Sequence, residues 1–167
     1  MKDAAPLIEK IVGFLREIGI SVQDGVVPLD SFLPGLRVEA GGLVVDRGRL
    51  SWPGDLLHEA GHLAVTPELA RAALADGLAA QLQAPYGGES EATAWAYAAC
   101  VKLGLPPEVL FHAGGYRGHS SGLINTFALG VYPGAFGLAQ AGMALLGKAA
   151  HEQGVVAYPS MLRWLRA

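Results

Sequence analysis

The sequence lacks two features that would point to particular classes of protein. It contains one cysteine, Cys100, so no disulfide can form within the chain, and a reducing compartment is expected. Charged residues make up only 16% of the 167 residues, the net charge is −3, and the basic residues are scattered. The sequence therefore predicts no cationic face for a phosphate backbone and argues against nucleic acid as a partner.

Long apolar runs are also scarce. Near the start, charges such as Glu9 and Lys10 interrupt the apolar residues, unlike the core of a secretory signal, so we expect a cytoplasmic protein. The uncharged run 118–147 is the one candidate for a membrane span, but it contains Pro133 and seven glycines. We expect buried helices there and no membrane insertion.

What is present is a globular composition, with 51% hydrophobic residues. The length favours a single domain over 1–167. We divide it into an N-terminal helix and hairpin (1–52), a core with the candidate site (53–103) and a helical C-terminal part (104–167). The expected fold class is α+β, mostly helical, with a small antiparallel sheet or hairpin.

Local patterns predict the elements of the first part. Apolar residues at helical spacing predict an amphipathic helix over 7–18 that ends at Gly19. Short β-prone runs at 36–40 and 43–46, linked by Gly41-Gly42, predict a hairpin. The stretch 47–52 is expected to extend this hairpin or to add a third strand.

The remaining segments read mainly as helices, because capping residues, prolines and glycines bound helix-favouring stretches. The expected helices are 53–65, a helix from Pro67 toward Leu82, 89–103, a short helix to His112, 123–129, 135–153 and 159–165.

The most informative pattern is H-E-x-x-H, formed by His58, Glu59 and His62. Two histidines at i and i+4 lie about 40° apart around a helix axis, so both imidazoles can reach one metal ion. Neutral imidazole suits Zn²⁺, and a neighbouring carboxylate can take a proton from metal-bound water. The pattern predicts a zinc site with Glu59 as general base.

A catalytic zinc site needs a third protein ligand. Glu89 and Glu91 open the otherwise apolar segment 89–103, but two residues apart on a helix means about 200°, so only one can face the metal. We favour Glu91, because it lies one turn before Trp95, within the apolar segment. Glu89 is the alternative ligand. Either acid could instead only favour the helix dipole at the exposed start of the helix, in which case neither binds the metal.

These motifs resemble those of the gluzincin zinc metallopeptidases. Leu57-His58-Glu59-Ala60-Gly61-His62-Leu63, followed by Glu89-x-Glu91-Ala92-x-x-Trp95-Ala96, is most similar to the small ImmA/IrrE-type members, the minigluzincins. The resemblance covers about residues 36–103 and implies a zincin-like fold in which the sheet lies beside the H-E-x-x-H helix. It also implies His58, His62 and Glu91 as ligands and Glu59 as base.

Further residues are candidates for narrower roles. Hydrolysis needs a donor for the oxyanion, and we name Tyr116 and His119, in a glycine-rich loop, with His112 just before it. Cys100 is expected to be a small buried hydrophobe, and Trp95 to belong to the core.

The expected function is a zinc-dependent peptidase that acts on a peptide or protein. The alternative is a catalytically silent metal-binding module, used as a sensor or for protein interaction. Glu59 favours catalysis, because a structural metal site needs no base and usually completes its coordination with protein ligands.

Overall fold

A computed structural model describes residues 4–75 and 88–167, and it confirms the mostly helical α+β class. In chain order the elements are α1 (Ala5–Glu17), β1 (Val22–Asp24), β2 (Leu36–Glu39), β3 (Gly42–Val45), α2 (Gly54–Val65), α3 (Glu68–Arg71), α5 (Glu89–Lys102), α6 (Pro107–Leu110), the 3-10 helix η1 (Tyr116–Gly118), α7 (Ser120–Ala128), α8 (Ala135–Gln140) and α9 (Gly147–Glu152).

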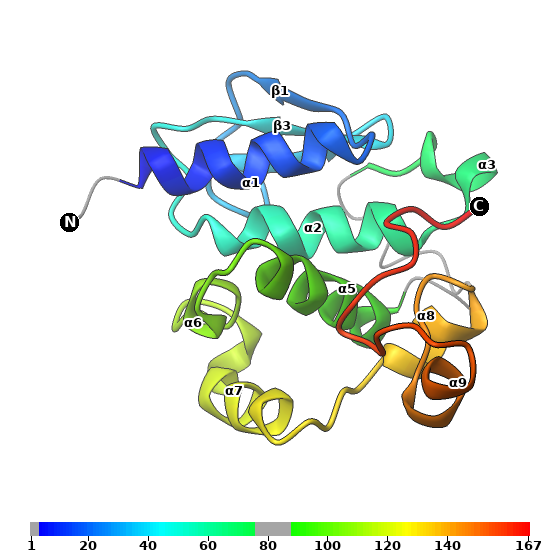
Figure 1. Ribbon diagram of the computed structural model, residues 1–167. Helices are drawn as coiled ribbons and strands as arrows, with labels where there is room; N and C mark the ends of the chain where they lie inside the picture. Colours follow the sequence, from blue (N-terminus) through cyan, green and yellow to red (C-terminus); the bar gives the residue numbers. More distant parts are fainter. Residues whose placement is uncertain (1–3, 76–87) are drawn as a thin grey trace.

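The helix α2 lies in the middle of the molecule. The sheet and α1 cover one side of it, and α5 packs along the other side (Figure 1). The helices α6 and α8 contact α5 in turn, and α7 follows α6. This arrangement places the H-E-x-x-H helix between the sheet and the next long helix.

The first helix forms as its periodicity predicts. Its buried residues include Ile8, Ile11 and Leu15, which recur at three- and four-residue spacing and so share one face. Gly19 follows the helix with a φ of 95°, a conformation that favours glycine. The expected helix over 7–18 is therefore confirmed, with a start two residues earlier.

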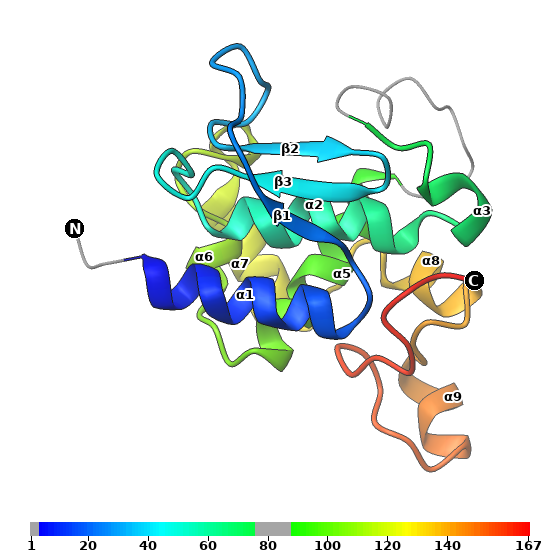
Figure 2. The same cartoon turned by 90° about the horizontal axis from the view of Figure 1, so that it is seen from above.

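The sheet has the order β1-β3-β2, and Figure 2 shows its three strands from above. β2 and β3 form the expected antiparallel hairpin, but the link is Ala40-Gly41, since Glu39 pairs with Gly42. Both link residues have positive φ, 47° and 74°, as in a type I′ turn. The third strand is β1, which pairs in parallel with β3, so the sheet is mixed. The stretch 47–52 forms turns, and the expectation of a strand there was wrong.

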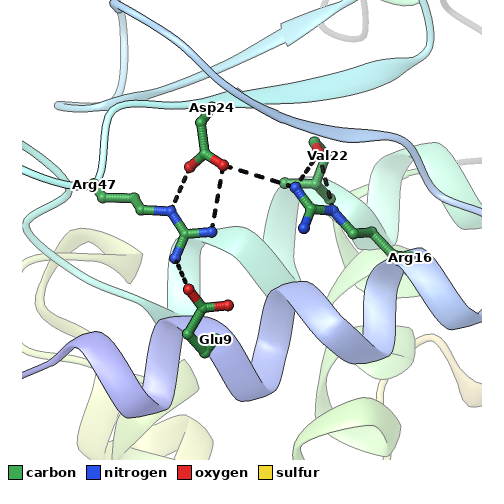
Figure 3. A network of polar contacts seen from close by, with 5 residues as sticks. All are labelled: Glu9, Arg16, Val22, Asp24 and Arg47. Atoms are coloured by element: carbon green, nitrogen blue, oxygen red, sulfur yellow. Dashed lines mark hydrogen bonds and ion pairs between the residues drawn. The ribbon is translucent and has the colours of Figure 1, made fainter.

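A polar network joins α1 to the sheet (Figure 3). Arg47, just after β3, contacts Glu9 of α1 at 2.6 Å and also pairs with Asp24 of β1. Arg16 of α1 donates to the Val22 carbonyl at 2.8 Å. Its guanidinium lies 3.8 Å from Asp24. These contacts attach α1 to β1 and to the residue Arg47 after β3.

The C-terminal part departs from the sequence predictions. The stretch 135–153 forms two short helices, α8 and α9, and 159–165 forms no helix. The backbone N–H of Leu162 donates instead to the Met143 carbonyl at 2.8 Å, and that of Arg166 to the Ala64 carbonyl at 2.8 Å. Backbone groups that bond to other segments are not available for a helix.

Two predictions from the sequence concern how long particular helices are. The helix expected from Pro67 toward Leu82 is short, Glu68–Arg71, and the part beyond residue 75 lies outside the described residues. Over the ranges 4–75 and 88–167, no helix combines the length and the apolar character needed to cross a bilayer.

Candidate metal centre

The helix α2 presents the H-E-x-x-H residues on one side and the core on the other. Pro53 precedes it and Asp55 lies in its first turn, both favourable at a helix start. Leu56, Leu57 and Leu63 are fully buried. This burial fixes the rotation of α2 about its axis, and hence the side from which its two histidines project.

The close packing of α5 on α2 depends on a glycine within the motif. A Cβ on Gly61 would lie 2.5 Å from the Ala92 carbonyl oxygen of α5, closer than real contacts allow. Since glycine has no Cβ, the two helix backbones can meet at this point. The contact brings the first residue of α5, Glu89, beside His58 and His62.

Three side chains converge at this place. The Nε2 atoms of His58 and His62 are 3.3 Å apart. The Glu89 carboxylate spans both rings, with Oε2 at 3.3 Å from His58 Nε2 and Oε1 at 3.2 Å from His62 Nε2. Within the described ranges, this is the one group of three or more His, Cys, Asp or Glu side chains whose ligand atoms gather closely enough to hold a metal ion.

The spacing of these atoms suits a tetrahedral zinc site. Zinc binds imidazole nitrogen and carboxylate oxygen at about 2.0–2.2 Å, so two ligands at tetrahedral angles lie about 3.3–3.5 Å apart. The observed contacts of 3.2–3.3 Å are close to that separation. Two imidazoles and one carboxylate also form a donor set that zinc accepts. The residues present therefore fit the metal that the sequence predicts.

The structure places Glu89 beside the two histidines, whereas the sequence analysis favoured Glu91. Glu91 faces α8 and the C-terminal segment, where its Oε2 lies 3.7 Å from Arg166 Nη1. A Cβ on Gly137 of α8 would lie 2.1 Å from Glu91 Oε1, so α8 packs directly over this carboxylate. Because residues 89 and 91 point in different directions on a helix, Glu89 alone faces the histidines.

The electrostatics of the cluster favour an ionised carboxylate. Hydrogen bonds from His58 and then from His62 hold the pKa of Glu89 well below its ordinary value, against the opposing effect of burial. The Glu89 side chain is 77% exposed, whereas those of His58 and His62 are only 17% and 12% exposed. The cluster therefore opens to solvent on the Glu89 side.

Glu59, the predicted base, follows His58 in α2 and is half-buried.

The two predicted oxyanion donors, Tyr116 and His119, lie in different places relative to the cluster. The Tyr116 hydroxyl lies 3.4 Å from His58 Nδ1, beside the cluster. His119 is exposed, and its backbone N–H donates to the Tyr116 carbonyl. The structure thus brings Tyr116 to the site and leaves the His119 side chain outside the cluster.

His112 is buried and pairs with Asp55, a contact that no sequence pattern predicts. Its Nε2 lies 2.8 Å from Asp55 Oδ1, and its ring stacks on Trp52 with centroids 4.6 Å apart. The partners are 57 positions apart in the chain, so no spacing rule connects them.

Other residues take the structural roles expected of them. Trp95 is fully buried, and its indole N–H donates to the Trp164 carbonyl at 2.8 Å. Cys100 is also buried, and burial raises the pKa of its thiol to about 11. Burial, together with the carboxylates of Asp55 and Glu89, raises the pKa of Tyr116, so its hydroxyl keeps its proton at neutral pH.

Comparison of the chain with protein-family models, curated proteins and solved structures finds no match. The interpretation of the site therefore depends on the geometry of His58, His62 and Glu89.

Proposed function

We propose that this protein is a zinc-dependent hydrolase that cleaves peptide bonds, with His58, His62 and Glu89 as metal ligands. The observation that supports this most directly is the mutual spacing of the three side chains, 3.2–3.3 Å between the contacting atoms. Three ligands from protein leave the fourth tetrahedral position for solvent or substrate, as in catalytic zinc sites.

We assign the following roles to the chain's own residues. Bound zinc would supply a Lewis acid that activates water and polarises the substrate carbonyl. Glu59 would accept the proton of the attacking water on its carboxylate and pass it to the leaving amine. The exposed side of the cluster at Glu89 would admit an extended peptide, and the nearby Tyr116 hydroxyl is the candidate donor to the oxyanion.

Metal analysis of the purified protein tests the first half of the proposal. We expect close to one zinc per chain in the parent and in His151→Ala, which replaces an exposed histidine of α9. We expect His58→Ala to lose the metal. A parent that takes up no zinc even when zinc is supplied would overturn the proposal.

Hydrolysis of an unfolded, fluorescently labelled protein tests the second half. Glu59→Gln keeps the shape of the side chain but cannot accept the proton, so it should retain zinc and lose turnover by roughly 100-fold or more. A zinc-loaded parent without activity on such substrates, or equal turnover by both proteins, would favour the catalytically silent metal-binding module.

A further inference from the structure

The two nitrogens of the His58 ring have different neighbours. Nε2 faces the cluster, at 3.3 Å from both His62 Nε2 and Glu89 Oε2. Nδ1 faces away from it, toward the Tyr116 hydroxyl at 3.4 Å, at the long end of the hydrogen-bond range. The two rings meet edge to face, with centroids 5.7 Å apart. Tyr116 is thus the neighbour on the side of His58 that a metal would not use.

The backbone that carries Tyr116 is strained. Tyr116 and Arg117 have φ of 54° and 51°, in the left-handed region that residues other than glycine seldom adopt. Each residue in this conformation costs folding free energy. A strained loop keeps this shape only when surrounding contacts determine it.

Both ends of the loop are held. On the N-terminal side, His112 pairs with Asp55 at 2.8 Å and stacks on Trp52. On the C-terminal side, the Ser120 hydroxyl donates to the His112 carbonyl at 2.7 Å. Asp55 belongs to the same helix as His58, three residues earlier, so the loop is attached to the helix that carries both metal-site histidines.

From this arrangement we infer that Tyr116 is a positioning residue for His58, an inference that rests on the proposed zinc site. When zinc takes the place of the Nε2 proton, Nδ1 carries the ring's remaining proton, and the Tyr116 hydroxyl oxygen would accept it in a hydrogen bond. That bond would stabilise the tautomer whose Nε2 carries the lone pair, and it would hold the ring with Nε2 toward His62 and Glu89. A group that hydrogen-bonds to the other ring nitrogen of a metal-binding histidine orients that ring. Loss of such a group typically weakens metal affinity by roughly 10–100-fold.

The test compares Tyr116→Phe with Tyr158→Phe, using zinc alone and a competing chromophoric chelator. Tyr158 is a matched control, because its buried hydroxyl also makes a hydrogen bond, to the Ala94 carbonyl at 2.9 Å, away from the cluster. We expect Tyr116→Phe to bind zinc roughly 10–100-fold more weakly than the parent, and Tyr158→Phe to bind like the parent. Thermal unfolding would verify that both variants fold.

A second measurement compares proton exchange in the parent and in Tyr116→Phe. In nitrogen NMR of the zinc-loaded parent, His58 should be protonated at Nδ1, with slow exchange of that proton with water; in Tyr116→Phe the exchange should become fast. A parent that binds no zinc would overturn the proposed function itself. A parent that binds zinc while Tyr116→Phe matches it in affinity and proton exchange would overturn the inference alone.

Discussion

Gly61 lies against the carbonyl of Ala92, and this contact sets how closely α2 approaches α5. A Cβ at Gly61 would lie 2.5 Å from that oxygen. Since Glu89 lies at the start of α5, the same contact sets its distance from His58 and His62.

We therefore expect Gly61→Ala to weaken both the fold and the metal site. Overpacking at such a place typically costs about 1–3 kcal/mol, and separating the helices moves Glu89 away from the imidazoles. The free energy of unfolding and the zinc affinity should both fall. Gly13→Ala in α1 is the control, because a Cβ there meets nothing within 4 Å. It should stabilise the helix by about 0.5–1 kcal/mol and leave zinc binding unchanged. Unchanged zinc affinity in Gly61→Ala would show that the contact is not needed.

The two glutamates of α5 should differ in their effect on metal binding. Glu89→Gln removes the carboxylate beside the histidines. Zinc affinity should therefore fall by more than the roughly 10–100-fold expected when a hydrogen-bond partner of a metal-binding histidine, such as Tyr116, is lost. Glu91→Gln changes the pairing with Arg166 at 3.7 Å and should leave zinc affinity within about twofold of the parent. Calorimetric titration of the two variants with zinc measures this difference. The opposite ranking would restore Glu91 as the ligand.

Cys100 should be an unreactive thiol in the folded protein. Burial raises its pKa from 9.0 to about 11, so the thiolate that reacts with disulfide reagents is scarce at neutral pH. Labelling should be slow in the native protein and fast in denaturant.

The raised pKa of Cys100 also predicts how the stability of the protein changes with pH. The folded pKa of Cys100 lies above the unfolded value, so its contribution to stability is complete below pH 9.0 and is lost as the pH rises toward about 11. Across that range the parent should lose stability relative to Cys100→Ala. Parallel curves for the two proteins would contradict the expected shift.

The network between α1 and the sheet should respond to acid. A hydrogen bond from Arg47, with its charge and that of Arg16, lowers the pKa of Asp24 below 3.8. The folded pKa is thus below the unfolded one, so the stabilising contribution is present above the unfolded value and is lost as the pH falls through the folded value. Asp24→Asn should lower the melting temperature slightly at neutral pH and should match the parent once the pH is well below 3.8. A difference that persists in strong acid would point to packing instead of charge.

The parts of this fold that depend on neighbouring residues could be predicted from the sequence. The periodicity of α1, the hairpin around Gly41 and the H-E-x-x-H helix each follow from interactions a few residues apart. The position of the hairpin link was wrong by one residue, because Ala40 adopts a positive φ that its residue type disfavours.

The glutamate that joins the two histidines could not be predicted in this way. Whether Glu89 or Glu91 faces the histidines depends on what covers the other side of α5. That side is taken by Gly137 of α8 and by Arg166, both distant in sequence. The Asp55–His112 pair is a similar case, because it forms only when α6 packs against the start of α2. Local patterns carry no information about such contacts.

The segment around Trp164 and Arg166 also bears on the order of events as the chain acquires its structure. The Trp164 carbonyl accepts from Trp95, 69 positions earlier, and the Arg166 guanidinium donates to the Val65 carbonyl, 101 positions earlier. Contacts at such separations form slowly, because a long loop must close before they contribute. The pair of helices that carries His62 and Glu89 should therefore reach its final packing late in folding, once the segment around Trp164 and Arg166 has packed against it.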